Sequence, residues 1–136
     1  MNGLGWLNDA VIDAYLALIV DRSREDSRLP KVYAFSSYFL NLYMEQGYDS
    51  IRTWTKHEDI FGYDMLLVPV NPGRHWCMAV VDLRINQIKY MDSLDMLNAE
   101  CLVKLSEYLN LEMINRKGFQ LSPHHWKLIH CSDLPL

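Results

Sequence analysis

Apolar residues at helical spacing occur in three parts of the chain. The first predicted helix covers residues 8–21, with Asn8 as its cap. The second runs from Ser36 or Ser37 to Gly47, and the third from Ala99 to about Asn110 after a capping Asn98. Residues 23–30 are charged and predict an exposed loop. The apolar positions are Val11, Ile12, Tyr15, Leu16 and Ile19 in the first helix and Leu102, Leu105, Tyr108 and Leu109 in the third.

Short apolar segments of strand length fill much of the second half. The run M-L-L-V-P-V at residues 65–70 predicts a buried strand. Residues 78–83 and 88–91 predict a hairpin that turns near Asn86-Gln87, and residues 126–131 predict a last strand. This order of elements, with helices first, an antiparallel sheet later and one more helix between strands, predicts an α+β domain.

Length, net charge and cysteine spacing limit the class of protein and its compartment. The 136 residues suit one domain, and the net charge of -4 disfavours nucleic acid or an anionic membrane as a partner. Cys77, Cys101 and Cys131 lie far apart without a C-x-x-C pair, which favours a reducing compartment, the nucleus or the cytoplasm. No stretch predicts a membrane span or a secretory signal. We therefore expect a soluble monomer without a cofactor.

His75 and Asp92 stand at the two ends of the predicted hairpin. A carboxylate that orients an imidazole, which then acts as general base, forms two thirds of a nucleophilic triad. The competing interpretation is that His75 is an ordinary turn residue and that Asp92 caps the next segment. With a turn at Asn86-Gln87, an ideal ladder puts Asp92 opposite Val81, about six residues or ~20 Å from His75. The periodicity therefore does not predict that the two side chains meet.

Two other sites are weaker alternatives. A zinc site would use His75, Cys77, His124, His125, His130 and Cys131, but only His125 and His130 have suitable His spacing, so we expect no metal. A dyad of His75 and Cys77 is disfavoured because Cys77 lies in the packed run C-M-A-V-V, where a thiol behaves as a small apolar side chain.

Several sequence blocks, in order along the chain, resemble the SUMO/sentrin-specific protease (SENP/Ulp) family of papain-like cysteine proteases. The blocks are W-L-N-D-A-V-I-D-A-Y-L, R-T-W-T-K, D-M-L-L-V-P-V-N-P-G-R-H-W-C-M-A-V-V-D-L-R and I-K-Y-M-D-S. The resemblance implies a partial papain-like fold of the Ulp/adenain type, in which helices pack on a mixed, mainly antiparallel sheet. It also implies cleavage after the C-terminal Gly-Gly of SUMO, in precursors and in SUMO-conjugated proteins.

Site residues follow from the resemblance position by position. His75 matches the catalytic histidine and Asp92 the carboxylate that orients it. Trp6 and Trp76 match the pair that covers a narrow tunnel for the Gly-Gly tail, whereas Trp54 and Trp126 are expected to pack in the core. Further positions match the surface that holds the body of SUMO, and these are Asp9, Phe35 and Arg52, with Asp9 and Arg52 as candidate ion-pair partners.

One motif of the family has no counterpart in residues 1–136. The family motif Q-x-N-G-x-D-C-G, which supplies the oxyanion glutamine and the nucleophilic cysteine, is absent from residues 1–136. Cys131 lies upstream of the Pro135 that precedes this motif and lacks the Asp-Cys-Gly context. We therefore expect a single, incomplete catalytic domain that is inactive on its own. The alternative is a module that binds SUMO or another ubiquitin-like modifier without cutting it.

Overall fold

The computed structural model describes residues 9–70, 77–92 and 98–131, and residues 9–11 and 131 by their backbone alone. A five-stranded sheet in the order β1-β2-β3-β4-β5 forms its centre. The strands are β1 (Val32–Ala34), β2 (Met65–Val70), β3 (Cys77–Asp82), β4 (Gln87–Met91) and β5 (Lys127–Cys131). The three central strands are antiparallel, and both edge strands are parallel to their neighbours. The α+β prediction with a mixed sheet is confirmed.

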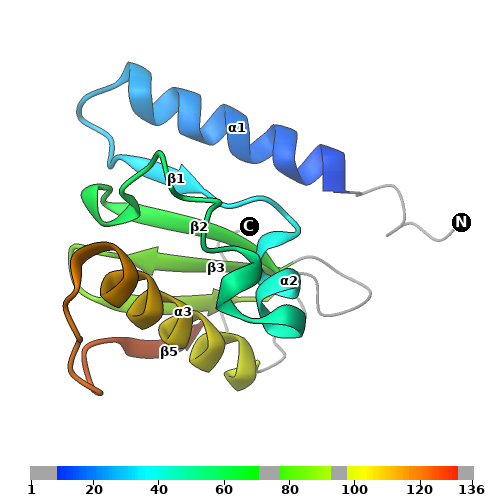
Figure 1. The fold of residues 1–136 in the computed structure, drawn as a ribbon. Coiled ribbons are helices and arrows are strands. Elements are labelled where there is room, and N and C mark those ends of the chain that lie inside the picture. Colours follow the sequence, from blue (N-terminus) through cyan, green and yellow to red (C-terminus); the bar gives the residue numbers. More distant parts are fainter. Residues whose placement is uncertain (1–8, 71–76, 93–97, 132–136) are drawn as a thin grey trace, which may run out of the picture.

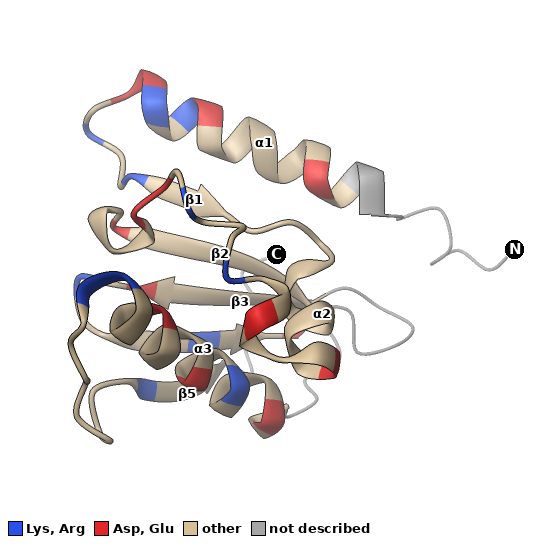
Figure 2. Ribbon diagram, viewed as in Figure 1, with Lys and Arg blue, Asp and Glu red and all other residues tan. Residues whose placement is uncertain are grey.

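The described residues form three α-helices that lie against this sheet. They are α1 (Asp9–Glu25), α2 (Phe39–Gln46) and α3 (Ala99–Lys117). Helices α2 and α3 lie over one face of the sheet, and α1 runs beside β1 at the sheet edge (Figure 1). Basic side chains lie in the last turns of α1 and α3 (Figure 2). Their positive charge interacts favourably with the negative ends of the helix dipoles. No helix in the described part of the chain is long and apolar enough to cross a membrane.

The core lies between the sheet and the two covering helices. Alternation along the strands turns every second side chain toward these helices. From the sheet come Leu66, Val68, Val70, Cys77, Ala79, Val81, Ile88 and Tyr90, and from the helices Phe39, Leu40, Tyr43, Leu102, Leu105, Tyr108 and Leu109. All four inward positions predicted for the third helix are buried, as is Trp126, whose indole donates a 3.0 Å hydrogen bond to Asn110.

The first two helices depart from their predicted patterns. Helix α1 continues to Glu25, so the predicted loop begins later than expected, and Ser23 bonds back to the carbonyl of Val20. On α1, Leu16 is buried as predicted, but Tyr15 is exposed because the helix meets the sheet only along its edge. Neither predicted serine is the N-cap of α2, which is Tyr38: the Ser37 hydroxyl donates to Asp13 of α1, and the Ser36 hydroxyl accepts the backbone N–H of Tyr38.

Helix α3 is longer than predicted. Asn98 caps it as expected, since its side chain accepts a 3.0 Å hydrogen bond from the backbone N–H of Cys101. The helix runs past the predicted end at Asn110 and stops at Gly118, which takes the left-handed conformation with a φ of 63°. The sequence hides this extension because Glu112, a charged residue, occupies a buried position of the helix.

The hairpin has a different register from the predicted one. Strands β3 and β4 pair Met78 with Met91 and Asp82 with Gln87, so residues 83–86 form the turn. Asp82 accepts hydrogen bonds from the backbone and guanidinium of Arg84, and Asn86 adopts a φ of 56°. The predicted turn at Asn86-Gln87 is therefore wrong, because the side chain of Asp82 stabilises an earlier turn.

Candidate active site

The new register moves Asp92 to a different place from the one that the ideal hairpin predicts. One step beyond the pair of Met78 and Met91, Asp92 comes opposite Cys77 instead of Val81. Asp92 is 2% exposed, and its carboxylate lies close enough to the Cys77 thiol to favour the protonated thiol. Cys77 follows His75 by two positions in the sequence. The separation of ~20 Å between His75 and Asp92 assumed the predicted register, and that register is not the one observed.

We call the group of Cys77, Tyr90 and Asp92 the Asp92 cluster. Tyr90 precedes Asp92 by two residues and is fully buried on the same side of the sheet. Its hydroxyl makes no hydrogen bond of ordinary geometry within the described residues, although Cys77 and Asn98 lie near it. The ring of Tyr90 stacks on His130 of β5, with centroids 6.2 Å apart. The cluster therefore holds a carboxylate among buried, weakly polar groups.

The cysteines whose side chains are described are poor nucleophiles. Burial raises the pKa of Cys77 to about 11, with the nearby Asp92 carboxylate acting in the same direction. Burial raises the pKa of Cys101 to about 12. Because the thiolate is the reactive form, neither thiol is activated at neutral pH. The prediction that Cys77 is a packed apolar side chain is confirmed.

A second group of residues with potential for recognition lies on residues 48–58, which we call the 48–58 segment. Arg52 is half exposed on it, donates a 3.3 Å hydrogen bond to Asn115 of α3 and lies 3.7 Å from Asp49. The Asp49 carboxylate is 91% exposed, so this ion pair is held weakly in water. Arg52 can therefore exchange its internal partner for an external carboxylate.

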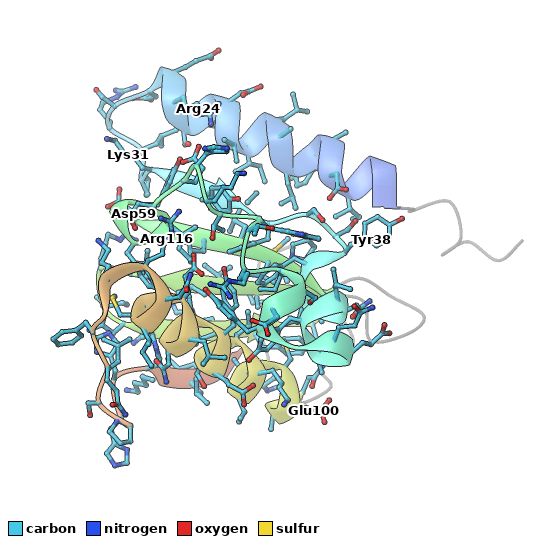
Figure 3. All side chains as sticks on the ribbon, in the orientation of Figure 1. Arg24, Lys31, Tyr38, Asp59, Glu100 and Arg116 are labelled. Atoms are coloured by element: carbon cyan, nitrogen blue, oxygen red, sulfur yellow. The ribbon has the colours of Figure 1, made fainter. Side chains whose placement is uncertain are left out.

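Trp54 departs from the expectation that it packs in the core. It is 42% exposed, and the nearby Tyr38 at the start of α2 is 60% exposed (Figure 3). Together with Leu42 they line a shallow hollow of about 480 Å³, which we call the Trp54 surface. The sequence feature that points to a surface position for Trp54 is its place two residues after Arg52 in the block R-T-W-T-K. Exposed aromatic rings of this kind are typical of protein interfaces.

Phe35, which the resemblance matches to the SUMO-binding surface, is 4% exposed and stacks on Phe39, with ring centroids 4.0 Å apart. Phe39 in turn contacts the indole of Trp54 at a centroid distance of 6.2 Å. Phe35 therefore packs beneath the Trp54 surface, whose exposed rings are Tyr38 and Trp54.

The remaining predicted site residues have less structural description. Trp6, His75 and Trp76 lie outside the described residues, and Asp9 is described only as the first residue of α1. No three His, Cys, Asp or Glu side chains of the described residues group as a metal site. The backbone of Cys131 ends β5, next to Met91.

Comparisons with known proteins identify the class to which this fold and site belong. A solved structure of the SUMO protease Ulp1 with its catalytic cysteine oxidised to a sulfinic acid superposes with a TM-score of 0.75 at 27% identity, over 91% of this chain and 55% of that one. The Ulp1 protease domain solved in complex with SMT3, the yeast orthologue of SUMO, superposes with a TM-score of 0.63 at 31% identity, over 74% of this chain and 46% of that one. The fold is that of a papain-like cysteine protease of the Ulp type.

The sequence comparisons agree with the structural ones. The profile of the Ulp1 protease family, C-terminal catalytic domain, matches residues 5–135, and the chain therefore belongs to this family. It is 42% identical over 135 residues to a sentrin-specific protease of Caenorhabditis elegans, covering 99% of this chain and 19% of the relative. The chain thus spans about a fifth of the length of that relative.

Proposed function

We propose that this chain is the part of a SUMO-specific cysteine protease that binds the modifier and supplies the general base. In this proposal His75 is the base, Asp92 orients it, and the nucleophilic cysteine comes from outside residues 1–136. The supporting observation is the hairpin register, which brings Asp92 opposite Cys77, two positions from His75 in the sequence. Family membership supports the same conclusion.

The proposed reaction has two steps. His75 accepts the proton of the cysteine thiol as the sulfur attacks the carbonyl carbon of the C-terminal glycine, and then donates it to the departing lysine amine. Water attacks the carbonyl carbon of the resulting thioester and gives a proton to His75; the carbon–sulfur bond then breaks, and His75 passes this proton to the departing sulfur. Asp92 is 2% exposed, and in such surroundings a carboxylate stabilises a developing imidazolium strongly.

Substrate recognition is assigned to two regions. Trp6 and Trp76 are proposed to enclose the Gly-Gly tail, because flat indoles leave room for glycine and exclude branched residues. Asp9, Arg52 and the Trp54 surface are proposed to hold the folded body of SUMO. The exposure of Arg52 and Trp54 supports this role, since both side chains can reach a partner. Phe35 is buried and supports the rings packed above it, and it also lines a hollow beside α1.

A binding titration tests the proposal directly. Mature SUMO is titrated into the wild-type chain and into Asp9→Ala, and the proposal expects saturable binding that the substitution weakens. A correctly folded wild-type chain that does not bind SUMO would contradict it. SUMO carrying a C-terminal electrophilic trap should label no residue of the 136. Labelling at Cys77 or Cys131 would overturn the assignment of the nucleophile.

A binding module without catalytic activity is the second candidate. The observation in its favour is that burial raises the pKa of both Cys77 and Cys101, so the described residues offer no nucleophile. The two candidates differ in one measurement: hydrolysis of a SUMO–peptide fusion by the complete protein supports the protease. We assign either form to the nucleus or cytoplasm, because Cys77 and Cys101 are free thiols.

A further inference from the structure

The 48–58 segment has little structure of its own. Only residues 48–50 form a short helical turn, and beyond it the backbone makes single bonds between residues three apart, such as Trp54 to Ile51 and Glu58 to Thr55. No residue of the segment pairs with a strand of the described sheet. A segment built this way needs contacts from elsewhere to hold one conformation.

Glu112 of α3 supplies these contacts from within the core. Its side chain is buried, and its carboxylate accepts hydrogen bonds of 2.5 Å from the Tyr48 hydroxyl and 2.5 Å from the Thr55 hydroxyl. These two donors lie on either side of Arg52 and Trp54 in the sequence. One carboxylate therefore fixes both ends of the stretch that carries the exposed recognition residues.

Arg116 extends the same connection by one helical turn. Its guanidinium lies 3.1 Å from the Glu112 carboxylate and donates to the backbone carbonyls of Thr55 and Glu58. Figure 3 shows Arg116 at the end of α3, near Asp59, which in turn pairs with Lys117 at 3.0 Å. Each bond joins α3 to a different point of the chain between residues 55 and 59.

A buried ion pair of this kind is weak evidence for stability. Removing two charges from water costs free energy that their attraction only partly repays, and apolar residues of similar volume often stabilise a fold better. The pair instead restricts geometry, because charge-assisted hydrogen bonds require defined positions of donor and acceptor. The contacts of Glu112 thus restrict where the 48–58 segment can lie on α3.

We propose that Glu112, with Arg116, is a positioning residue for modifier binding: it fixes the 48–58 segment on α3 and so sets where Arg52 and Trp54 meet the partner. This rests on the proposed function, since the partner is taken to be SUMO. Glu112 itself does not touch the partner, because it is buried. Its substitution acts on affinity through Arg52 and Trp54.

The same helix offers a control with a similar hydrogen bond. Glu107 accepts a 2.5 Å hydrogen bond from the Tyr43 hydroxyl, as Glu112 does from Tyr48, but it joins α3 to α2 and its side chain is half exposed. Glu112→Gln keeps the shape of the side chain and loses the charge that Arg116 pairs with. It should weaken SUMO binding about tenfold, whereas Glu107→Gln should leave the affinity within about twofold. Circular dichroism selects a temperature at which every variant is folded.

Two further measurements separate positioning from general destabilisation. Backbone amides of residues 53–58 should exchange hydrogen faster in Glu112→Gln than in Glu107→Gln, without SUMO present. In the Glu112→Gln background, Arg52→Ala should have a smaller effect than in wild type, because Arg52 is already misplaced. Thr55→Val, which removes one bond to Glu112, should reproduce part of the loss if Glu112→Gln fails to fold.

The outcomes are distinguishable. Equal affinities of wild type and folded Glu112→Gln, or additive effects of Glu112→Gln and Arg52→Ala, would overturn the positioning role while leaving the proposed function intact. If the wild-type chain does not bind SUMO, the proposed function fails and this inference fails with it. Faster exchange in residues 53–58 together with weaker, non-additive binding is the expected result.

Discussion

The Asp92 cluster and the 48–58 segment use charge in opposite ways. Asp92 is 2% exposed and lies among buried side chains, whereas the side chain of Arg52 is 50% exposed and its partner Asp49 is almost fully in water. Electrostatic interactions are strong where water is excluded and are screened where it is present. Reaction chemistry therefore suits the first region, and reversible recognition by many weak contacts suits the second.

The largest effect expected from this contrast is on turnover. In the complete protein, Asp92→Asn should lower kcat about 10⁴-fold, because the amide no longer orients and stabilises the charged imidazole. Steady-state hydrolysis of a SUMO–peptide fusion measures this, with SUMO affinity as the control that should stay within about twofold. A loss in kcat smaller than tenfold would show that Asp92 does not support the base.

The aromatic contact of the Trp54 surface should have the next largest effect. Trp54→Ala is expected to weaken SUMO binding about 30-fold, because a partly exposed indole that a partner covers buries a large apolar area. Calorimetric titration measures the dissociation constant. Phe119→Ala is the control, since Phe119 is 60% exposed but follows the end of α3. Equal losses for the two variants would argue against a specific surface.

Arg52 should contribute less than Trp54. Arg52→Ala is expected to weaken binding about threefold at low salt, because an exposed charge pays for desolvation with little net gain. The difference from wild type should shrink as sodium chloride is raised, since added ions screen the attraction. Titrations at two salt concentrations provide the measurement, and a deficit that does not depend on salt would contradict an electrostatic role.

The last effect is one on stability and concerns the buried thiol of the Asp92 cluster. The pKa of Cys77 is about 11 in the folded chain, above its ordinary value of 9.0, so the folded state keeps the proton that the unfolded state loses between these values. The resulting stabilisation is complete below pH 9 and is lost as the pH rises toward 11, by about 1 kcal/mol per pH unit. Urea unfolding at pH 8 and pH 10 should show a smaller decrease for Cys77→Ala than for wild type. Equal decreases would mean that the thiol does not titrate in this range.

The sequence predicted several elements from simple local signals. Strand β2 is a continuous apolar run, the inward positions of α3 recur at helical spacing, and Asn98 is a favourable cap residue; these three and the last strand, β5, agree with the structure. Strand β1 was missed, since three residues carry too short a pattern. The candidate site residues on the hairpin came from the family resemblance, and periodicity did not predict the register that brings Asp92 opposite Cys77.

Two of the failures share a physical cause, which is a polar side chain whose hydrogen bonds the apolar pattern does not reveal. Glu112 is charged yet buried, so the pattern of α3 seemed to end before it. Asp82 accepts the backbone N–H of Arg84 and thereby starts the turn earlier than Asn86-Gln87. Trp54 is a different case, because it is exposed although its apolar size favours burial. Periodicity alone encodes neither side-chain hydrogen bonds nor the exposure of a single ring.

The turn at residues 83–86 belongs to the register that brings Asp92 opposite Cys77. Because side chains alternate along a strand, a slip of β4 by one residue against β3 would turn Asp92 to the opposite face of the sheet, where Met91 now points. A slip of two residues would restore the face but shift the carboxylate by about 7 Å along the strand. In the proposed mechanism, the register of this hairpin therefore matters as much as the identity of the carboxylate.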